Sequence, residues 1–242
     1  MDSASAPASQ SGDHQSPVAA RFDLWAAGYD TSVLQDAFYA RLHHHVLHLA
    51  ARIKPSPRRV LDLGCGTGRL LYAAAARFPH AELLGADISA GMLEHAQARA
   101  RAAAPIRLGD RRAGHREVAF LQADAAHLPL ITAAFDVVTC TASSHHWPDP
   151  QPALAELRRV TAPEGLLILA HVPGVAAWDR RSGTSRLTVL LGDAGFRISK
   201  AALYAECPVM PTTVVLCARP DTLPRRRSGL IRRLRPGDGA AV

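Results

Sequence analysis

The sequence predicts an α/β fold built on a doubly wound, mostly parallel sheet. Short apolar segments alternate with helical patterns between residues 59 and 172, and these segments are apolar on both faces. Strands have this character when helices cover both sides of a parallel sheet. The last two strand-like segments, 196–205 and 213–218, are separated by residues 206–211, which are too few for a crossover helix. They therefore predict an antiparallel hairpin at the end of the sheet.

Helical patterns come first in the chain. Residues 19–30 form a short segment, and residues 31–53 form a longer one in which apolar side chains recur every three or four positions. The expected strands after it are 59–63, 81–88, 118–123, 135–140 and 165–172. The expected helices among them and before the hairpin are 68–78, 89–104 with Ser89 as N-cap, 152–161 and 185–194. Residues 105–117 are less regular and predict a loop.

Length and composition indicate one folded domain. The 242 residues are 48% hydrophobic, which is too apolar for a disordered chain, and 17 Gly and 17 Pro without a period exclude a collagen-like one. No run approaches the ~18 unbroken apolar residues of a membrane helix. We expect a disordered N-terminus over residues 1–17, one domain with its helical cap over 18–219, and a basic, disordered tail over 220–242.

The net charge of +7 is concentrated in that tail. Residues 219–242 contain seven Arg and two Asp, which leaves only a mild positive charge on the body. A nucleic-acid groove would need the charge on the folded body. We therefore expect no nucleic-acid partner and no integral membrane contact, with weak, salt-sensitive anion binding by the tail.

The four cysteines, at positions 65, 140, 207 and 217, have no CxxC spacing, so neither a zinc site nor a dithiol motif is expected. Three of them lie in or beside apolar segments and predict buried thiols. The N-terminus lacks the basic and apolar regions of a secretory signal. These features favour a reducing, cytoplasmic compartment.

A glycine-rich turn follows the first expected strand. Gly64, Gly66 and Gly68 have GxGxG spacing, and Asp62 stands two residues before the first of them. Glycines at such a turn let the backbone approach a ligand closely. The dinucleotide fingerprint has its third glycine one residue later, and the lysine of a phosphate-binding loop is missing after Arg69. An ordinary tight turn is the competing interpretation.

Two acids stand at the ends of the next two strands. Asp87 can accept hydrogen bonds from two ribose hydroxyls at the carboxyl edge of the sheet, and Asp124 can accept one from the exocyclic amine of a base. Either carboxylate alone could simply cap the helix or turn that follows it. One acid at each of two successive strand ends favours a nucleoside site.

These motifs resemble the class I S-adenosylmethionine-dependent methyltransferases, in particular the small-molecule group that includes the ubiquinone and menaquinone C-methyltransferases. The resemblance covers roughly residues 21–219. Its segments are VLDLGCGTGR, GADIS, QADAAHLPL, FDVVTCTASSHHWPDP and EGLLILAH, with FDLWAAGYD similar to the cap of the group. It implies a Rossmann-like sheet of seven strands, an antiparallel last strand beside the fifth, and an N-terminal helical cap.

The resemblance also implies S-adenosyl-L-methionine as cofactor. Asp87 would bind the ribose, Ile88 would line one face of the adenine, and Thr141 would lie near the reactive methyl group. The full set of implied cofactor-binding residues is Tyr29, Asp62, Gly64, Cys65, Gly66, Gly68, Asp87, Ile88, Asp124, Ala125 and Thr141.

The segment after the fourth strand contains the candidate catalytic residues, His145 and His146. An imidazole has the right ordinary pKa to take a proton from an acceptor. The competing interpretation is that both histidines only shape the loop. No acid stands between Asp136 and Asp149, so we expect no metal. The histidines at 43, 44, 45 and 48 are expected to form a solvated helix face rather than a metal site.

The expected function is methyl transfer to a small, partly apolar metabolite, since the segment after the fifth strand, residues 173–183, is short and suits a small acceptor. Neither the acceptor nor the oligomeric state follows from the sequence. One alternative is an RNA methyltransferase, for example one acting on tRNA through the Arg-rich tail. A second is a non-catalytic module that only binds S-adenosylmethionine, and a third is a nicotinamide-dependent oxidoreductase.

Overall fold

The computed structural model describes residues 16–103, 118–175, 178, 183–205 and 212–221. One sheet of seven strands forms its centre, in the order β3-β2-β1-β4-β5-β7-β6. The strands are β1 (Arg59–Leu63), β2 (Glu82–Asp87), β3 (Val118–Gln122), β4 (Phe135–Thr141), β5 (Thr161–His171), β6 (Phe196–Tyr204) and β7 (Thr213–Pro220). The predicted α/β fold class is confirmed.

The pairing of the strands also follows the prediction. β1 pairs in parallel with β2 and β4, and the parallel ladder continues to β3 on one side and β5 on the other. β7 is antiparallel to both β5 and β6, so the last strand lies between them. Strand order reverses between β1 and β4, and ligands of such sheets bind outside the carboxyl ends of the strands at this point.

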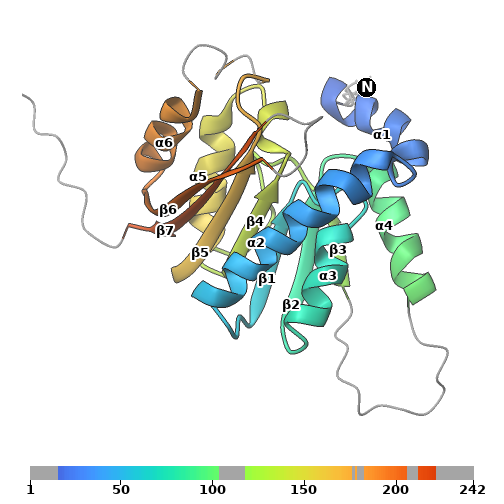
Figure 1. The fold of residues 1–242 in the computed structure, drawn as a ribbon, viewed down its shortest axis with the longest axis horizontal. Helices are drawn as coiled ribbons and strands as arrows, with labels where there is room; N and C mark the ends of the chain where they lie inside the picture. The colour runs from blue at the N-terminus through green and yellow to red at the C-terminus, as the bar shows by residue number, and fades with distance from the viewer. Residues whose placement is uncertain (1–15, 104–117, 176–177, 179–182, 206–211, 222–242) are drawn as a thin grey trace, which may run out of the picture.

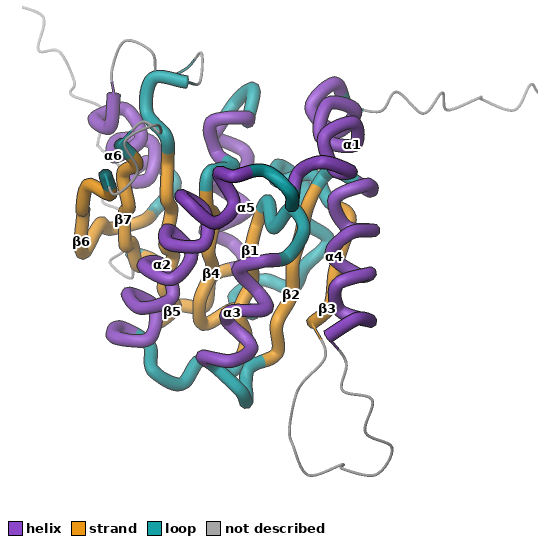
Figure 2. The backbone as a smooth tube through the Cα atoms, turned by 45° about the vertical axis from the view of Figure 1, so that its right-hand side comes forward, coloured by secondary structure: helices purple, strands orange, loops and turns teal. Residues whose placement is uncertain are grey.

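Helices cover both faces of the sheet (Figure 1). On one face, side chains of α2 (Ala40–Ile53), α3 (Arg69–Arg77) and α4 (Ala90–Ala103) pack against the strands in one buried cluster. On the opposite face, side chains of α5 (Pro150–Val160) and α6 (Gly183–Asp193) pack against the strands in a second buried cluster. In Figure 2, α1 (Pro17–Tyr29) lies beside the upper end of α4, at the carboxyl edge of the sheet, so it is placed to cover a site there.

The second predicted helix departs from a regular α-helix. Residues Gln35–Tyr39 form a π-helix, η1, which runs directly into α2. Single π-turns of this kind are rare and occur often at functional sites. A π-turn holds one residue more than an α-helical turn. The three- and four-residue spacing of apolar side chains is too irregular to show a shift of a single residue, so the sequence cannot reveal such a turn.

Smaller differences concern element ends. α5 begins at Pro150 rather than 152, because the Asp149 side chain accepts a hydrogen bond from the Gln151 N–H at 3.0 Å and caps the helix. Ser89 caps α4 as predicted, since its Oγ accepts from the Met92 N–H at 3.1 Å. β7 extends to Pro220, and the Asp221 N–H donates to the Gly195 carbonyl.

Three of the four cysteines, Cys65, Cys140 and Cys217, are buried free thiols, as predicted. No helix among the described residues is long and apolar enough to span a membrane. The expectations for Cys207, for the loop at 105–117 and for most of the two terminal segments fall on residues outside the described ranges.

Candidate functional site

The glycine turn after β1 has left-handed backbone at Gly64 (φ 72°), Gly66 (φ 53°) and Gly68 (φ 76°). The three positions differ in what surrounds them. A Cβ atom on Gly64 would lie 2.5 Å from Cβ of Ser143, and one on Gly68 would lie 3.0 Å from the Phe120 ring. A Cβ on Gly66 would meet only the Tyr29 ring, at 3.9 Å. Gly64 and Gly68 therefore permit close packing, whereas Gly66 borders open space.

Asp87 holds this turn in place. Its Oδ2 accepts a hydrogen bond from the Gly66 N–H at 2.8 Å, and its Oδ1 accepts one from the Ser89 N–H at 2.9 Å. Burial raises the pKa of Asp87, while these bonds act to lower it. Each carboxylate oxygen can accept a second hydrogen bond. Asp87 can therefore fix the turn and still receive hydroxyl groups of a ligand.

A pocket opens at this edge of the sheet, under α1. It brings together nine of the predicted residues: Tyr29, Gly64, Gly66, Asp87, Ile88, Asp124, Ala125, Thr141 and His146. Asp124 stays largely exposed there, and its Oδ1 accepts from the Ala126 N–H at 3.0 Å. The remaining wall includes apolar and aromatic side chains, among them Val18, Phe22, Met92 and Trp147.

Four predicted residues lie outside this pocket: Cys65 lines a smaller, adjoining cavity, and the other three line neither. Gly68 packs α3 against β3 and does not line the pocket. Asp62 is buried below it, where its Oδ1 accepts from the Thr139 hydroxyl at 2.7 Å. Burial raises the pKa of Asp62 to about 7, and the Asp87 charge adds to the rise. His145 also lies outside the pocket lining, with its Nδ1 buried and unpaired among the described residues.

A second, smaller cavity adjoins the first. The two share Tyr29, Gly64, Gly66 and Thr141. The residues that line only the second are Gln35, Tyr39, His43, Cys65, Thr67 and Arg69. Its polar side chains and the Arg69 cation suit the charged end of a ligand whose other parts lie in the main pocket.

The histidine-rich stretch of α2 corrects one prediction. His44 and His48 are exposed, as expected of a solvated face. The expectation is wrong for His43, which lines the second cavity, and for His45, whose ring packs 5.4 Å from that of Tyr204. Burial and the Arg69 charge lower the pKa of His43 to about 4. The π-turn just before α2 contributes Gln35 and Tyr39 to the same cavity.

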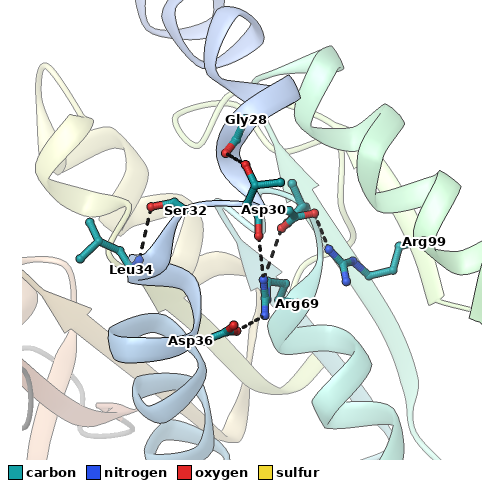
Figure 3. A network of polar contacts seen from close by, with 9 residues as sticks. Gly28, Asp30, Ser32, Leu34, Asp36, Arg69 and Arg99 are labelled. Carbon is teal, nitrogen blue, oxygen red and sulfur yellow. Dashed lines mark hydrogen bonds and ion pairs between the residues drawn. The ribbon is translucent and has the colours of Figure 1, made fainter.

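A network around Asp30 ties the cap to the body (Figure 3). The Thr67 hydroxyl donates to Asp30 Oδ1 at 2.7 Å, and both Arg69 and Arg99 form ion pairs with its carboxylate. Arg69 also pairs with Asp36 at 2.8 Å. The segment after α1 is therefore linked to α3 and α4. Sequence reasoning missed this network: Asp30 ends the cap segment FDLWAAGYD, but nothing in that segment marks its distant partners.

His146 contacts the cap on the other side of the pocket. Its Nδ1 lies 3.0 Å from Nη2 of Arg21, and its ring lies 4.9 Å from that of Phe22. Burial, with the Arg21 charge, lowers the pKa of His146 to about 4, and burial, with the neighbouring His146 and His171, lowers the pKa of His145 to about 3. Both imidazoles are therefore neutral at neutral pH. Among the described residues, no three His, Cys, Asp or Glu side chains gather as a metal site.

Comparison with known proteins gives a consistent family. Residues 61–169 match the model of a methyltransferase domain. The chain is 35% identical over 158 residues to a demethylmenaquinone methyltransferase of Thermus thermophilus, which covers 65% of this chain and 64% of that protein. It is 36% identical over 190 residues to a malonyl-[acyl-carrier protein] O-methyltransferase of Geobacter sulfurreducens, with 78% and 58% covered. The chain thus spans about half to two thirds of the length of these curated relatives.

Among solved structures, the fold is similar to that of a SAM-dependent methyltransferase from Aquifex aeolicus. The TM-score is 0.61 at 17% identity, with 81% of this chain and 97% of that chain covered. At such identity the likeness concerns the fold alone. The domain match, the curated relatives and the arrangement of glycine turn and strand-end acids agree: residues 61–169 form a methyltransferase domain, and the chain is similar to S-adenosylmethionine-dependent methyltransferases.

Proposed function

We propose that the protein transfers a methyl group from S-adenosyl-L-methionine to a small, partly apolar metabolite. One observation supports this above all: the Gly66 turn, held by the hydrogen bond from its N–H to the Asp87 carboxylate, lies between two adjoining cavities, one walled by Asp87, Ile88, Asp124 and Ala125 and the other polar. A cofactor with a nucleoside at one end and an amino acid at the other matches this pair of cavities in shape and chemistry.

The residues present fit the cofactor in detail. Asp87 would receive the ribose hydroxyls, Ile88 and Ala125 would flank the adenine, and Asp124 would accept from its amine. Gly66 leaves room that any Cβ would fill. Arg69 and the tyrosines of the second cavity would hold the amino-acid end. When bound, the cofactor supplies a methyl group on a positively charged sulfur.

The acceptor would enter beside the cap. Phe22, Trp147 and Val18 give that part of the pocket an apolar, partly aromatic wall, which favours a small metabolite with an apolar body. The chain would act mainly by aligning this acceptor with the cofactor and by excluding water. His146, and behind it His145, are the candidate catalytic groups at this end. We also propose a cytoplasmic location, which the three buried free thiols support.

The decisive experiment is calorimetry of the full chain with S-adenosylhomocysteine, the demethylated cofactor. We expect saturable one-site binding, with no heat from NADH as the control for an oxidoreductase. A metabolite screen with labelled S-adenosylmethionine would then identify the acceptor. Binding of NADH, or no binding of S-adenosylhomocysteine, would overturn the proposal.

A further inference from the structure

The contact between Arg21 and His146 decides which proton the imidazole carries. Nη2 of Arg21 lies 3.0 Å from Nδ1 of His146. A guanidinium stays protonated in proteins and can only donate hydrogen bonds. Nδ1 must therefore be the acceptor, so His146 is neutral and its N–H is on Nε2.

This tautomer determines what His146 can offer to a ligand. Nδ1 is occupied, and Nε2 has no hydrogen-bond partner among the described residues. His146 lines the main pocket, so Nε2–H is the ring group that it has left for an acceptor there. It is a donor, and it cannot take up a proton while Nδ1 faces Arg21. His145 lies outside the pocket lining and its Nδ1 is buried, so its ring is not placed to act as the base instead.

The charge of Arg21 lies beside the pocket: Arg21 is exposed and does not itself line the pocket, but its guanidinium contacts His146 and Phe22, which do. Its Cζ is 5.1 Å from the centroid of the Phe22 ring, which also lines the pocket. No carboxylate of the described residues forms an ion pair with Arg21, whereas Arg69 and Arg99 both pair with Asp30. A cation at the rim of the pocket and a neutral N–H donor on its lining thus stand next to each other, at the apolar end of the pocket.

From this geometry we infer that Arg21 and His146 bind an anionic oxygen of the methyl acceptor, a carboxylate or an ionised enol or phenol attached to an apolar body. The inference rests on the proposed function and names the acceptor class. Such an acceptor needs no enzyme base. Its own electron pair forms the new bond to the methyl carbon, the bond from that carbon to sulfur breaks with its pair on sulfur, and the two opposite charges are lost together.

The first test reads the tautomer directly. We expect long-range ¹H–¹⁵N correlation of the histidine side chains, in the full chain with S-adenosylhomocysteine, to show His146 Nδ1 unprotonated and Nε2 protonated at pH 7. Arg21→Met should abolish this fixed tautomer, whereas Arg41→Met, an equal loss of charge at an exposed site on α2, should not. A proton on Nδ1 of His146 in the wild type would overturn the inference.

The second test reads the acceptor class. Aromatic carboxylates and phenolates, such as 1-naphthoate, are titrated into the S-adenosylhomocysteine complex beside neutral isosteres such as 1-naphthamide. We expect the anions to bind more tightly, Arg21→Met to weaken them at least tenfold without affecting the isosteres, and Arg41→Met to have no effect. His146→Gln, which keeps a donor, should retain more anion affinity than His146→Leu.

The outcomes separate this inference from the proposed function. If S-adenosylhomocysteine does not bind, the proposed function fails, whatever the tautomer. If it binds and no anion binds more tightly than its isostere, or Arg21→Met leaves that difference unchanged, the acceptor class is wrong and the proposed function stands.

Discussion

The Asp87 carboxylate accepts a hydrogen bond from the backbone N–H of Gly66 at 2.8 Å, which joins the end of β2 to the glycine turn after β1. The other carboxylate oxygen accepts from the Ser89 N–H. The shape of the turn and the proposed ribose contact therefore rest on one side chain. A substitution at Asp87 is expected to act on both.

We predict that Asp87→Asn weakens S-adenosylhomocysteine binding at least tenfold and lowers the free energy of unfolding slightly. The amide must present its NH₂ to one of two backbone N–H donors, and a charged acceptor of ribose hydroxyls is lost at about 1.5–3 kcal/mol per bond. Calorimetry and urea denaturation measure the two effects. Glu94→Gln, an exposed change of the same kind on α4, serves as control. Wild-type affinity in Asp87→Asn would contradict the assignment of the ribose site.

Gly66 and Gly64 should respond differently to alanine. Gly66→Ala adds a Cβ that meets only the Tyr29 ring, so the stability cost is about 1–2 kcal/mol for the left-handed backbone, but the Cβ enters the space for the cofactor. Gly64→Ala adds the same strain and a 2.5 Å clash with Ser143 Cβ, so it should be much less stable. Thermal denaturation ranks stability, and calorimetry should show binding lost in Gly66→Ala. A folded Gly66→Ala that binds normally would mean that the turn is only structural.

The site residues that could be predicted from the sequence are those marked by a motif in the nearby sequence. The spacing of Gly64, Gly66 and Gly68 and the acids at two strand ends depend only on neighbouring residues and on the order of the sheet. The topology places these residues at one edge, because the carboxyl ends of parallel strands meet there. The hairpin was predictable for a similar reason, since its connection is too short to cross the sheet.

The parts that sequence missed depend on the position of the cap. Arg21 and His146 are 125 positions apart, and nothing near either residue marks the other. His43 lines the second cavity together with Gln35 and Tyr39 of the π-turn, and this cavity forms only where α2 meets the glycine turn. Tertiary placement rather than local pattern determined both.

The Asp30 network should make the cap a structural requirement for binding. Asp30→Ala removes a hydrogen bond from Thr67 and two ion pairs at a half-buried site, so we expect a loss of about 1–3 kcal/mol in the free energy of unfolding and weaker S-adenosylhomocysteine binding. Asp36→Ala is a matched control, because Asp36 is 87% exposed and its one ion pair within the described part of the chain is with Arg69. That variant should lose at most about 1 kcal/mol. Equal effects of the two substitutions would show that Asp30 does not hold the cap.

Asp62 should make the stability of the protein depend on pH. Its pKa is about 7 in the folded protein, mainly because of burial, and near 3.8 when the chain is unfolded. Between these values the folded state keeps a proton that the unfolded state releases, so the contribution of Asp62 to stability falls as pH rises from about 4 to 7. His43, His145 and His146 have lowered pKa values and act in the opposite direction below about pH 6.5.

Because these effects oppose each other, the pH dependence of the wild type alone does not isolate Asp62. The quantity to measure is the difference in the free energy of unfolding between a variant and the wild type at each pH. Asp62→Asn can still accept the Thr139 hydroxyl hydrogen bond but cannot ionise. We predict that urea denaturation shows Asp62→Asn gaining stability relative to the wild type as pH rises from 5 to 8, by on the order of 2 kcal/mol. The histidine contributions cancel in this difference, because both proteins share them. A stability difference that stays constant over this range would mean that Asp62 is ionised throughout, and that water or a neighbouring donor offsets its burial.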